Sequence, residues 1–226
     1  MAENFVAITP KGSFYQGIYN SPFYQTPTIA FSFSATPGKG CSDGTVVIGG
    51  RGDELTTGKI DLYSPIRLLV LLGSGYWPFP SVTAFYSCRQ RNELTVRSVP
   101  AAVLESPFIA MDSDSFSNFA ASINCQPVSY DGGIQICLVD CDAQVQHLGL
   151  EMTDNPDEPI STGIYYLKNP KVKLPHSDQC AYAFARSYDG FWCIGTSFFE
   201  GRTLSFTNLD QTIFLPQITI ADTKPQ

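Results

Sequence analysis

The sequence predicts an all-β domain, built as a compact antiparallel β-barrel or sandwich with one short helix. Three observations predict it. Charged residues make up only 15% of the 226 residues, against about 25% in a typical domain. Phe and Tyr are abundant (16 and 11), and 18 glycines and 16 prolines supply frequent turns. Aromatic content, low charge and many turns together favour β structure, and one sandwich or barrel can have this length.

The clearest strand signal is the alternation at 28–34. Ile29, Phe31 and Phe33 fall on one face, while small or polar side chains occupy the other. Successive side chains of a strand point to opposite faces. We therefore expect one face on a core and the other toward water or small side chains.

Other strands are predicted where short apolar or β-branched runs are bounded by turn residues. In chain order these extended segments are 3–9, 13–19, 45–48, 59–63, 66–72, 81–88, 93–99, 133–146, 148–152, 163–167, 182–186, 191–196, 203–207 and 212–220. Segments 66–72 and 81–88 are predicted to form a hairpin of inner strands around the loop tip 73–80. The chain is interpreted as one domain, 1–226, with flexible ends at 1–4 and 221–226.

The helix is predicted within 106–124. Phe116, Phe119 and Ile123 recur at spacings of three and four residues, which is the period of an α-helix. Asp112 or Ser113 is expected to cap its N-terminus.

The charge excludes several classes of partner. The net charge is −7 with only 14 lysines and arginines, too few to neutralise a phosphate backbone or an anionic membrane. A basic partner fits an acidic surface better. No secretory signal follows Met1, and no apolar run reaches the roughly 20 residues of a membrane span.

The seven cysteines are Cys41, Cys88, Cys125, Cys137, Cys141, Cys180 and Cys193. An odd count in a chain of this size predicts mostly buried, reduced thiols. Cys137 and Cys141 would lie about 13 Å apart in a regular strand. That distance excludes both a disulfide between them and a shared zinc ion.

No catalytic set is recognisable, and we predict no enzyme, cofactor or metal. The histidines, His147 and His176, accompany no G-x-S-x-G elbow, and His147 is interpreted as a surface residue rather than a partner of Cys141. A glycosidase or esterase with an acidic pair remains an alternative. Its candidate acids are Asp112, Asp114, Asp140, Asp142, Asp154, Asp157 and Glu158, of which Asp140 and Asp142 share one face of a predicted strand.

Binding is the better-supported class, because both tryptophans lie beside turn residues. Large aromatic side chains in loops mark binding faces, although they can also plug the end of a barrel. Arg51 and Asp53 flank Gly52 in the tripeptide that integrins recognise. The candidate binding residues are Arg51, Asp53, Tyr76, Trp77, Phe79, Tyr188 and Trp192. A carbohydrate-binding module that stacks Trp77 or Trp192 on sugar is the main alternative function.

The segment KGSFYQGIYNSPFYQTPTIAFSFS at 11–34, followed by the glycine-rich loop at 38–50, resembles the astrovirus capsid spike. The resemblance implies a β-barrel with peripheral hairpins that forms a homodimer on the virion surface. It implies attachment to a host-cell receptor, presentation of epitopes to neutralising antibodies, and synthesis in the host cytoplasm. It carries over no individual receptor residue.

Overall fold

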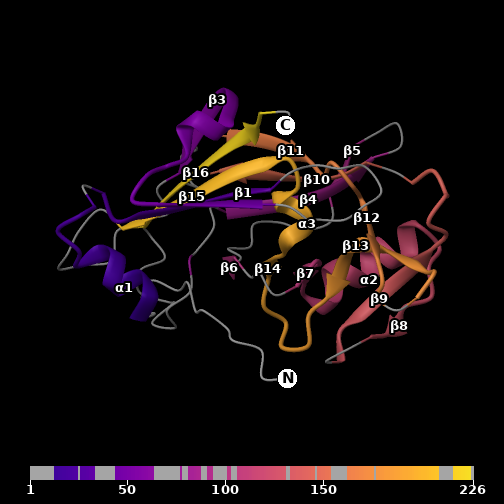
Figure 1. Ribbon diagram of the computed structural model, residues 1–226. Coiled ribbons are helices and arrows are strands. Elements are labelled where there is room, and N and C mark those ends of the chain that lie inside the picture. Colours follow the sequence, from indigo (N-terminus) through magenta and orange to yellow (C-terminus); the bar gives the residue numbers. More distant parts are fainter. Residues whose placement is uncertain are drawn as a thin grey trace.

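The computed structural model describes residues 13–24, 26–33, 44–63, 77, 81–87, 91–93, 101–102, 106–130, 133–145, 147–153, 162–175, 177–208 and 216–224. The predicted all-β class is confirmed, since most described elements are strands of three sheets (Figure 1). The strand order of each described sheet has two ends, so a sandwich-like arrangement, and not a closed barrel, fits the described strands.

The central sheet has five antiparallel strands in the order β2-β1-β15-β16-β3. Their bounds are β2 Gly44–Ile48, β1 Thr28–Phe33, β15 Arg202–Asn208, β16 Pro216–Thr223 and β3 Thr56–Tyr63. The first half of the chain therefore supplies three strands, and the last quarter supplies the two between them.

The side chains of β1 alternate between the two faces of this sheet, as the pattern at 28–34 predicted. Ile29 and Phe31 lie in the core with Phe206, Leu204 and Ile220. The opposite face is buried too, and it carries small and hydroxyl side chains. Thr28 and Thr207 share a hydrogen bond of 2.7 Å, and Thr203 donates to Ser32 at 3.0 Å. The second face thus makes small-residue contacts rather than facing water.

A four-stranded sheet, β11-β10-β4-β5, packs on the same core, and a seven-stranded sheet follows β6-β14-β7-β13-β9-β8, with β12 paired to β13. Their bounds are β4 Ser81–Ser87, β5 Arg91–Glu93, β6 Ala101–Ala102, β7 Ile109–Met111, β8 Val128–Ser129, β9 Gln135–Val139, β10 His147–Thr153, β11 Thr162–Tyr166, β12 Lys171–Lys173, β13 Cys180–Arg186 and β14 Cys193–Ile194. Two pairs are parallel, β7 with β13 and β6 with β14, so the fold is not purely antiparallel.

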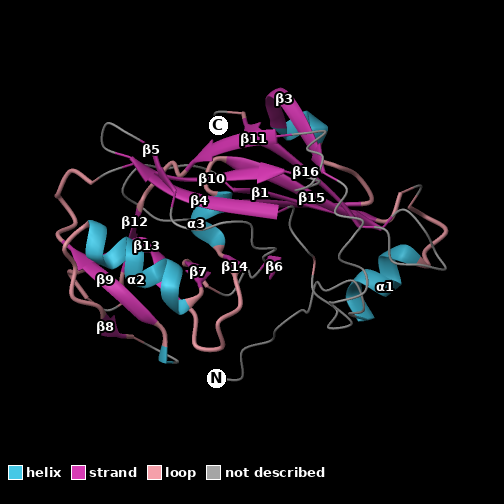
Figure 2. Cartoon of the chain, turned by 180° about the vertical axis from the view of Figure 1, so that it is seen from behind, coloured by secondary structure: helices cyan, strands magenta, loops and turns pink. Residues whose placement is uncertain are grey.

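The prediction of one helix is wrong. The described residues hold α1 Ser13–Tyr19, α2 Ser113–Ser122, α3 Thr196–Phe199 and the short 3-10 helix Asp53–Leu55. Figure 2 shows α1 and α2 at opposite ends of the molecule. Segment 13–19 is helical because Tyr15 and Ile18, three residues apart, both enter the core. No helix of the described part has the length and apolarity of a membrane span.

Several predicted strand bounds also change. Within the predicted strand 133–146, the described strand is β9, which ends at Val139. The predicted strand 191–196 contains β14, and α3 begins at its last residue. The end of the chain is more ordered than predicted. Strand β16 extends to Thr223, and the N–H of Lys224 donates to the carbonyl oxygen of Leu55. The predicted strand 66–72 lies outside the described residues, whereas 81–88 is confirmed as β4, which pairs with β10 and β5.

The cysteine prediction is wrong for four of the five described cysteines. Cys125 pairs with Cys137, and Cys141 pairs with Cys180. Sequence spacing excluded a disulfide between Cys137 and Cys141. Each of them instead pairs with a cysteine from another part of the chain. Cys125 follows α2, and Cys180 begins β13 opposite Val139 of β9. Cys193 is a free thiol.

These disulfides predict a stability that depends on oxidation. The Cys141–Cys180 bridge closes a separation of 39 residues, and restricting the unfolded chain by that length is worth about 4 kcal/mol. We expect C141S/C180S to lose about that free energy of unfolding in urea denaturation. The control C193S should change it by less than about 1 kcal/mol; equal losses in both variants would contradict the pairing.

Candidate functional site

The candidate site is built around the carboxylate of Asp112, where β7 ends and α2 begins. The residue has extended backbone angles and is the N-cap of α2, as the sequence predicted. The four N–H groups of a helix's first turn have no partner within the helix. Asp112 Oδ1 accepts hydrogen bonds from two of them, Asp114 N at 3.0 Å and Ser115 N at 2.9 Å.

The second carboxylate oxygen is also fully used. Oδ2 accepts from Ser115 Oγ at 2.6 Å and from the indole Nε1 of Trp192 at 2.7 Å. An ionised carboxylate offers about four lone-pair sites. Four donors of the protein itself therefore occupy the acceptor capacity of Asp112.

The charge state of Asp112 follows from the same contacts. Partial burial opposes ionisation, but the hydrogen bonds from Ser115, Trp192 and Asp114 outweigh it, so the pKa of Asp112 lies below its usual value of 3.8. No second carboxylate of the described residues is among the groups that shift this pKa. The side chain is a carboxylate at neutral pH.

An exposed aromatic loop starts and ends beside this carboxylate. Ser187 N donates to the carbonyl oxygen of Met111 at 2.8 Å, and Trp192 returns to Asp112. Between these two anchors, Tyr188 is 84% exposed and Phe191 is 67% exposed. The loop is tightened by Asp189, whose Oδ1 accepts from Phe191 N at 3.1 Å.

The two predicted tryptophans are buried rather than exposed. Each is only 5% exposed. Trp77 packs edge-on against Tyr15, with ring centroids 4.9 Å apart, and tilts against Phe206 at 5.4 Å. Trp192 supports the loop through Asp112. Of the predicted aromatic candidates, Tyr188 is exposed, and Tyr76 and Phe79 lie outside the described residues.

Phe191 was not among the predicted binding residues, because the segment 191–196 was expected to be a strand. Strand β14 begins only at Cys193, so Phe191 belongs to the loop. The dipeptide Asp189-Gly190 is a turn signal, and it indicated that a loop lies just before this strand.

Arg51 and Asp53 lie at the start of the 3-10 helix and pair with each other, with Nη2 3.1 Å from Oδ2. Both side chains are about half exposed. Gly52 between them adopts a left-handed conformation (φ 69°), and a Cβ there would lie 3.4 Å from the Cβ of Ala30. The mutual ion pair leaves neither charge fully available to a partner.

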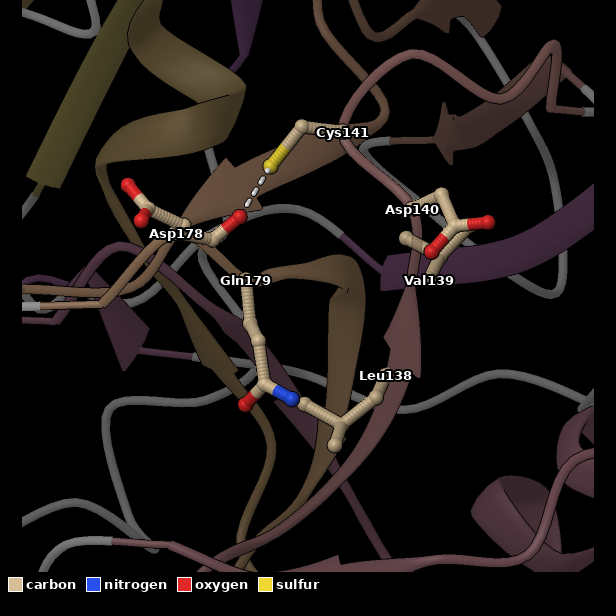
Figure 3. Close-up of a pocket in the computed structure, with 6 residues that line it drawn as sticks. All are labelled: Leu138, Val139, Asp140, Cys141, Asp178 and Gln179. Carbon is tan, nitrogen blue, oxygen red and sulfur yellow. Dashed lines mark hydrogen bonds between the residues drawn. The ribbon is translucent and has the colours of Figure 1, made fainter.

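The acidic pair predicted at Asp140 and Asp142 is not on a strand. Both follow β9, in a turn closed by Ala143 N and the carbonyl oxygen of Asp140 at 3.0 Å. A nearby pocket of about 360 Å³ is lined by Leu138, Val139, Asp140, Cys141, Asp178 and Gln179. Figure 3 shows the carboxylates of Asp140 and Asp178 directed away from each other. The pocket does not assemble the facing acids that hydrolysis needs.

The remaining sequence candidates for chemistry are also accounted for. Cys141 is disulfide-bonded and has no thiol to form a dyad with His147, which is exposed on β10 with its ring against Tyr166. The contact drawn in Figure 3 between Cys141 Sγ and the Asp178 carbonyl oxygen, at 3.4 Å, involves a sulfur without a proton. His176, Asp154, Asp157 and Glu158 lie outside the described residues.

Comparison with known proteins gives a fold likeness alone. No family model matches the chain, and no curated protein sequence matches it. The structure is similar to the crystal structure of an aspartic proteinase from Irpex lacteus, with a TM-score of 0.65 and 14% sequence identity. The match covers 93% of this chain, which spans 60% of the length of that proteinase. The resemblance to astrovirus spikes stays a prediction.

The burial of Trp77 predicts a structural rather than a binding role. Replacing a buried aromatic side chain by Ala costs about 3–5 kcal/mol, and we expect W77A to lose that much in urea denaturation. The matched control Y188A, at an exposed ring, should lose less than about 1 kcal/mol. A stable W77A would show that the indole is not part of the core.

The contacts of Asp112 predict an acid-sensitive contribution to stability. Since its pKa is lower in the folded than in the unfolded protein, ionised Asp112 stabilises the fold fully above about pH 5, and this contribution is lost as the pH falls through the lowered pKa. D112N should therefore differ more from the wild type at pH 7 than at pH 2.5 in urea denaturation. A difference that grows toward low pH would contradict the lowered pKa.

Proposed function

We propose that this chain is a polypeptide-binding domain on an aspartic-proteinase-like scaffold, and that it binds through the loop 188–191 without catalysis by Asp112. The loop presents two large, exposed aromatic rings on a support that is fixed at both ends. Rigid aromatic side chains bury much area at low entropic cost, which is typical of binding anchors. The chain's charge of −7 favours a basic polypeptide.

The occupied carboxylate of Asp112 carries the non-catalytic part of the proposal. Aspartic proteases use two carboxyl groups that share one proton, because like charges so close cannot both ionise. Asp112 instead has its pKa lowered by protein donors, and those donors leave no lone pair for a water or a substrate. The geometry of Asp112 supports a structural role, in which its carboxylate caps α2 and binds the indole of Trp192.

Acid proteolysis is the second candidate, and the fold likeness favours it. If Asp112 took part in it, this carboxylate would have to release Trp192 and share a proton with a second carboxyl group. Fold alone does not establish this chemistry, since one fold hosts many functions.

The disulfides favour an oxidising compartment as the place where the domain works, because such bonds persist there and are rare in the cytosol. The resemblance to the astrovirus spike implies synthesis in the cytoplasm and display on a virion. The disulfides do not support that location.

A binding assay and a hydrolysis assay test the proposal. With reduced, alkylated ribonuclease A as an unfolded basic probe, we expect saturable binding in biolayer interferometry that Y188A/F191A weakens at least tenfold. The control L62A, at an exposed leucine of β3, should bind as the wild type does.

Hydrolysis distinguishes the second candidate. A quenched fluorescent peptide mixture at pH 3 to 7 should be cleaved by neither the wild type nor D112N. Cleavage by the wild type that D112N abolishes would overturn the non-catalytic assignment, and binding that Y188A/F191A leaves unchanged would overturn the loop assignment.

A further inference from the structure

A second surface lies between α1 and β2. Figure 2 shows α1 at the opposite end of the molecule from α2. A groove of about 400 Å³ is lined by Ser13, Phe14, Gly17, Ile18, Ser21, Tyr24 and Ile48. Beside it, Val46 is 54% exposed and Ile48 is 38% exposed. The surface is apolar, and none of the lining residues carries a charge.

Strand β2 is an edge strand of the described central sheet, where its neighbour is β1. The direction of its free hydrogen-bonding groups follows from one bond. Gly49 N donates to the carbonyl oxygen of Thr28 at 2.8 Å, so this pair is a hydrogen-bonded one. Hydrogen-bonded and non-bonded pairs alternate along an antiparallel ladder. The backbone N–H and C=O groups of Gly44, Val46 and Ile48 therefore point away from β1, toward the open edge.

The side chains of Val46 and Ile48 share the core face of the sheet, because their register partners are Phe31 and Ile29. An added strand would lie about 4.8 Å beyond β2. Its residue opposite Ile48 would then direct a side chain of that same face toward the groove beside α1. One segment can thus form hydrogen bonds with the backbone groups of β2 and fill the groove with a side chain.

The described residues of β2 carry none of the side chains that usually prevent pairing at an edge. Natural edge strands carry Lys, Pro, inward charges or bulges that prevent association. Strand β2 reads Gly-Thr-Val-Val-Ile, with no charge and no proline. An uncharged segment fits this uncharged strand better than a charged one, because burying an unpaired charge against it would be costly.

We propose that β2 binds an extended, uncharged peptide segment as an additional strand, with an apolar side chain of that segment seated in the groove formed by Phe14, Ile18, Tyr24 and Ile48. Main-chain hydrogen bonds give such strand addition its affinity, and pockets for alternate side chains give it specificity. This surface is separate from the loop 188–191, so it stands independently of the function proposed for that loop.

A second copy of the chain fits this surface less well than a peptide. Two β2 strands paired about a two-fold axis at Val46 would place Gly44 of the second copy opposite Ile48, and an axis at Val47 would place Val46 there. Glycine has no side chain to fill the groove, and valine fills less of it than a larger apolar residue. A peptide with a large apolar residue at that position therefore fits the groove better than a second copy.

The test uses a synthetic octapeptide that alternates Leu and Thr, carries a neutral ethylene-glycol tail and is labelled with fluorescein. We expect saturable binding to the wild-type chain in fluorescence anisotropy, which V46K and I48D each weaken at least tenfold. V128K, a lysine at an exposed valine of β8, is the matched control and should leave affinity unchanged. A loss of affinity in Y188A would place the peptide on the loop 188–191 and would overturn the proposal.

A peptide with Asp in place of each Leu should not bind, because the groove offers no cation. Sedimentation velocity run in parallel reports self-association. Absence of saturable binding, equal affinity in V46K and V128K, or a dimer that V46K dissociates without any peptide binding would each overturn the proposal. Thermal melts confirm that the variants are folded, and the partly exposed I48D carries the test should V46K not fold.

Discussion

The hydrogen bonding of Asp112 is the interaction on which the described site depends. One carboxylate caps the first turn of α2, holds Ser115 and binds the indole of Trp192, a residue eighty positions later in the chain. It thereby joins the end of β7, the start of α2 and the approach to β14. With Ser187 bonded to Met111, both ends of the loop 188–191 are fixed to the same point. A loop so held loses less backbone entropy when Tyr188 and Phe191 bind a partner.

The likeness to an aspartic proteinase concerns this scaffold, and the chemistry depends on what the carboxylate is free to do. A general base needs an open lone pair and a pKa matched to its task. Asp112 has donors on both oxygens and a lowered pKa. The same side chain can be structural or catalytic on a given fold, and here the four donors favour the structural role.

Local pattern predicted those parts of the structure that depend on local physics. The alternation at 28–34 predicted β1, and the spacing of Phe116 and Phe119 with Asp112 before them predicted α2 and its cap. Segment 13–19 misled because SFYQGIY holds aromatic and β-branched residues that favour strands, while burial of Tyr15 and Ile18 on one side makes it helical.

The site itself required contacts between distant residues. No local signal joins Trp192 to Asp112, Cys125 to Cys137 or Cys141 to Cys180, because the tertiary fold around the seven-stranded sheet brings each pair together. Tryptophan beside turn residues was compatible with a binding face or with a plug, and both indoles are buried. Turn residues locate a loop, but they do not tell which of its aromatic side chains faces solvent, as Phe191 and Trp192 show.

The most direct test of this account is the titration of Asp112 itself, followed by NMR at its side-chain carboxyl carbon from pH 2 to 7. The account predicts a single step with a pKa below 3.8 that W192F moves upward, because the substitution removes the Nε1 donor. A pKa above that value would contradict the account, and so would two coupled steps of the kind that two carboxyl groups sharing a proton produce.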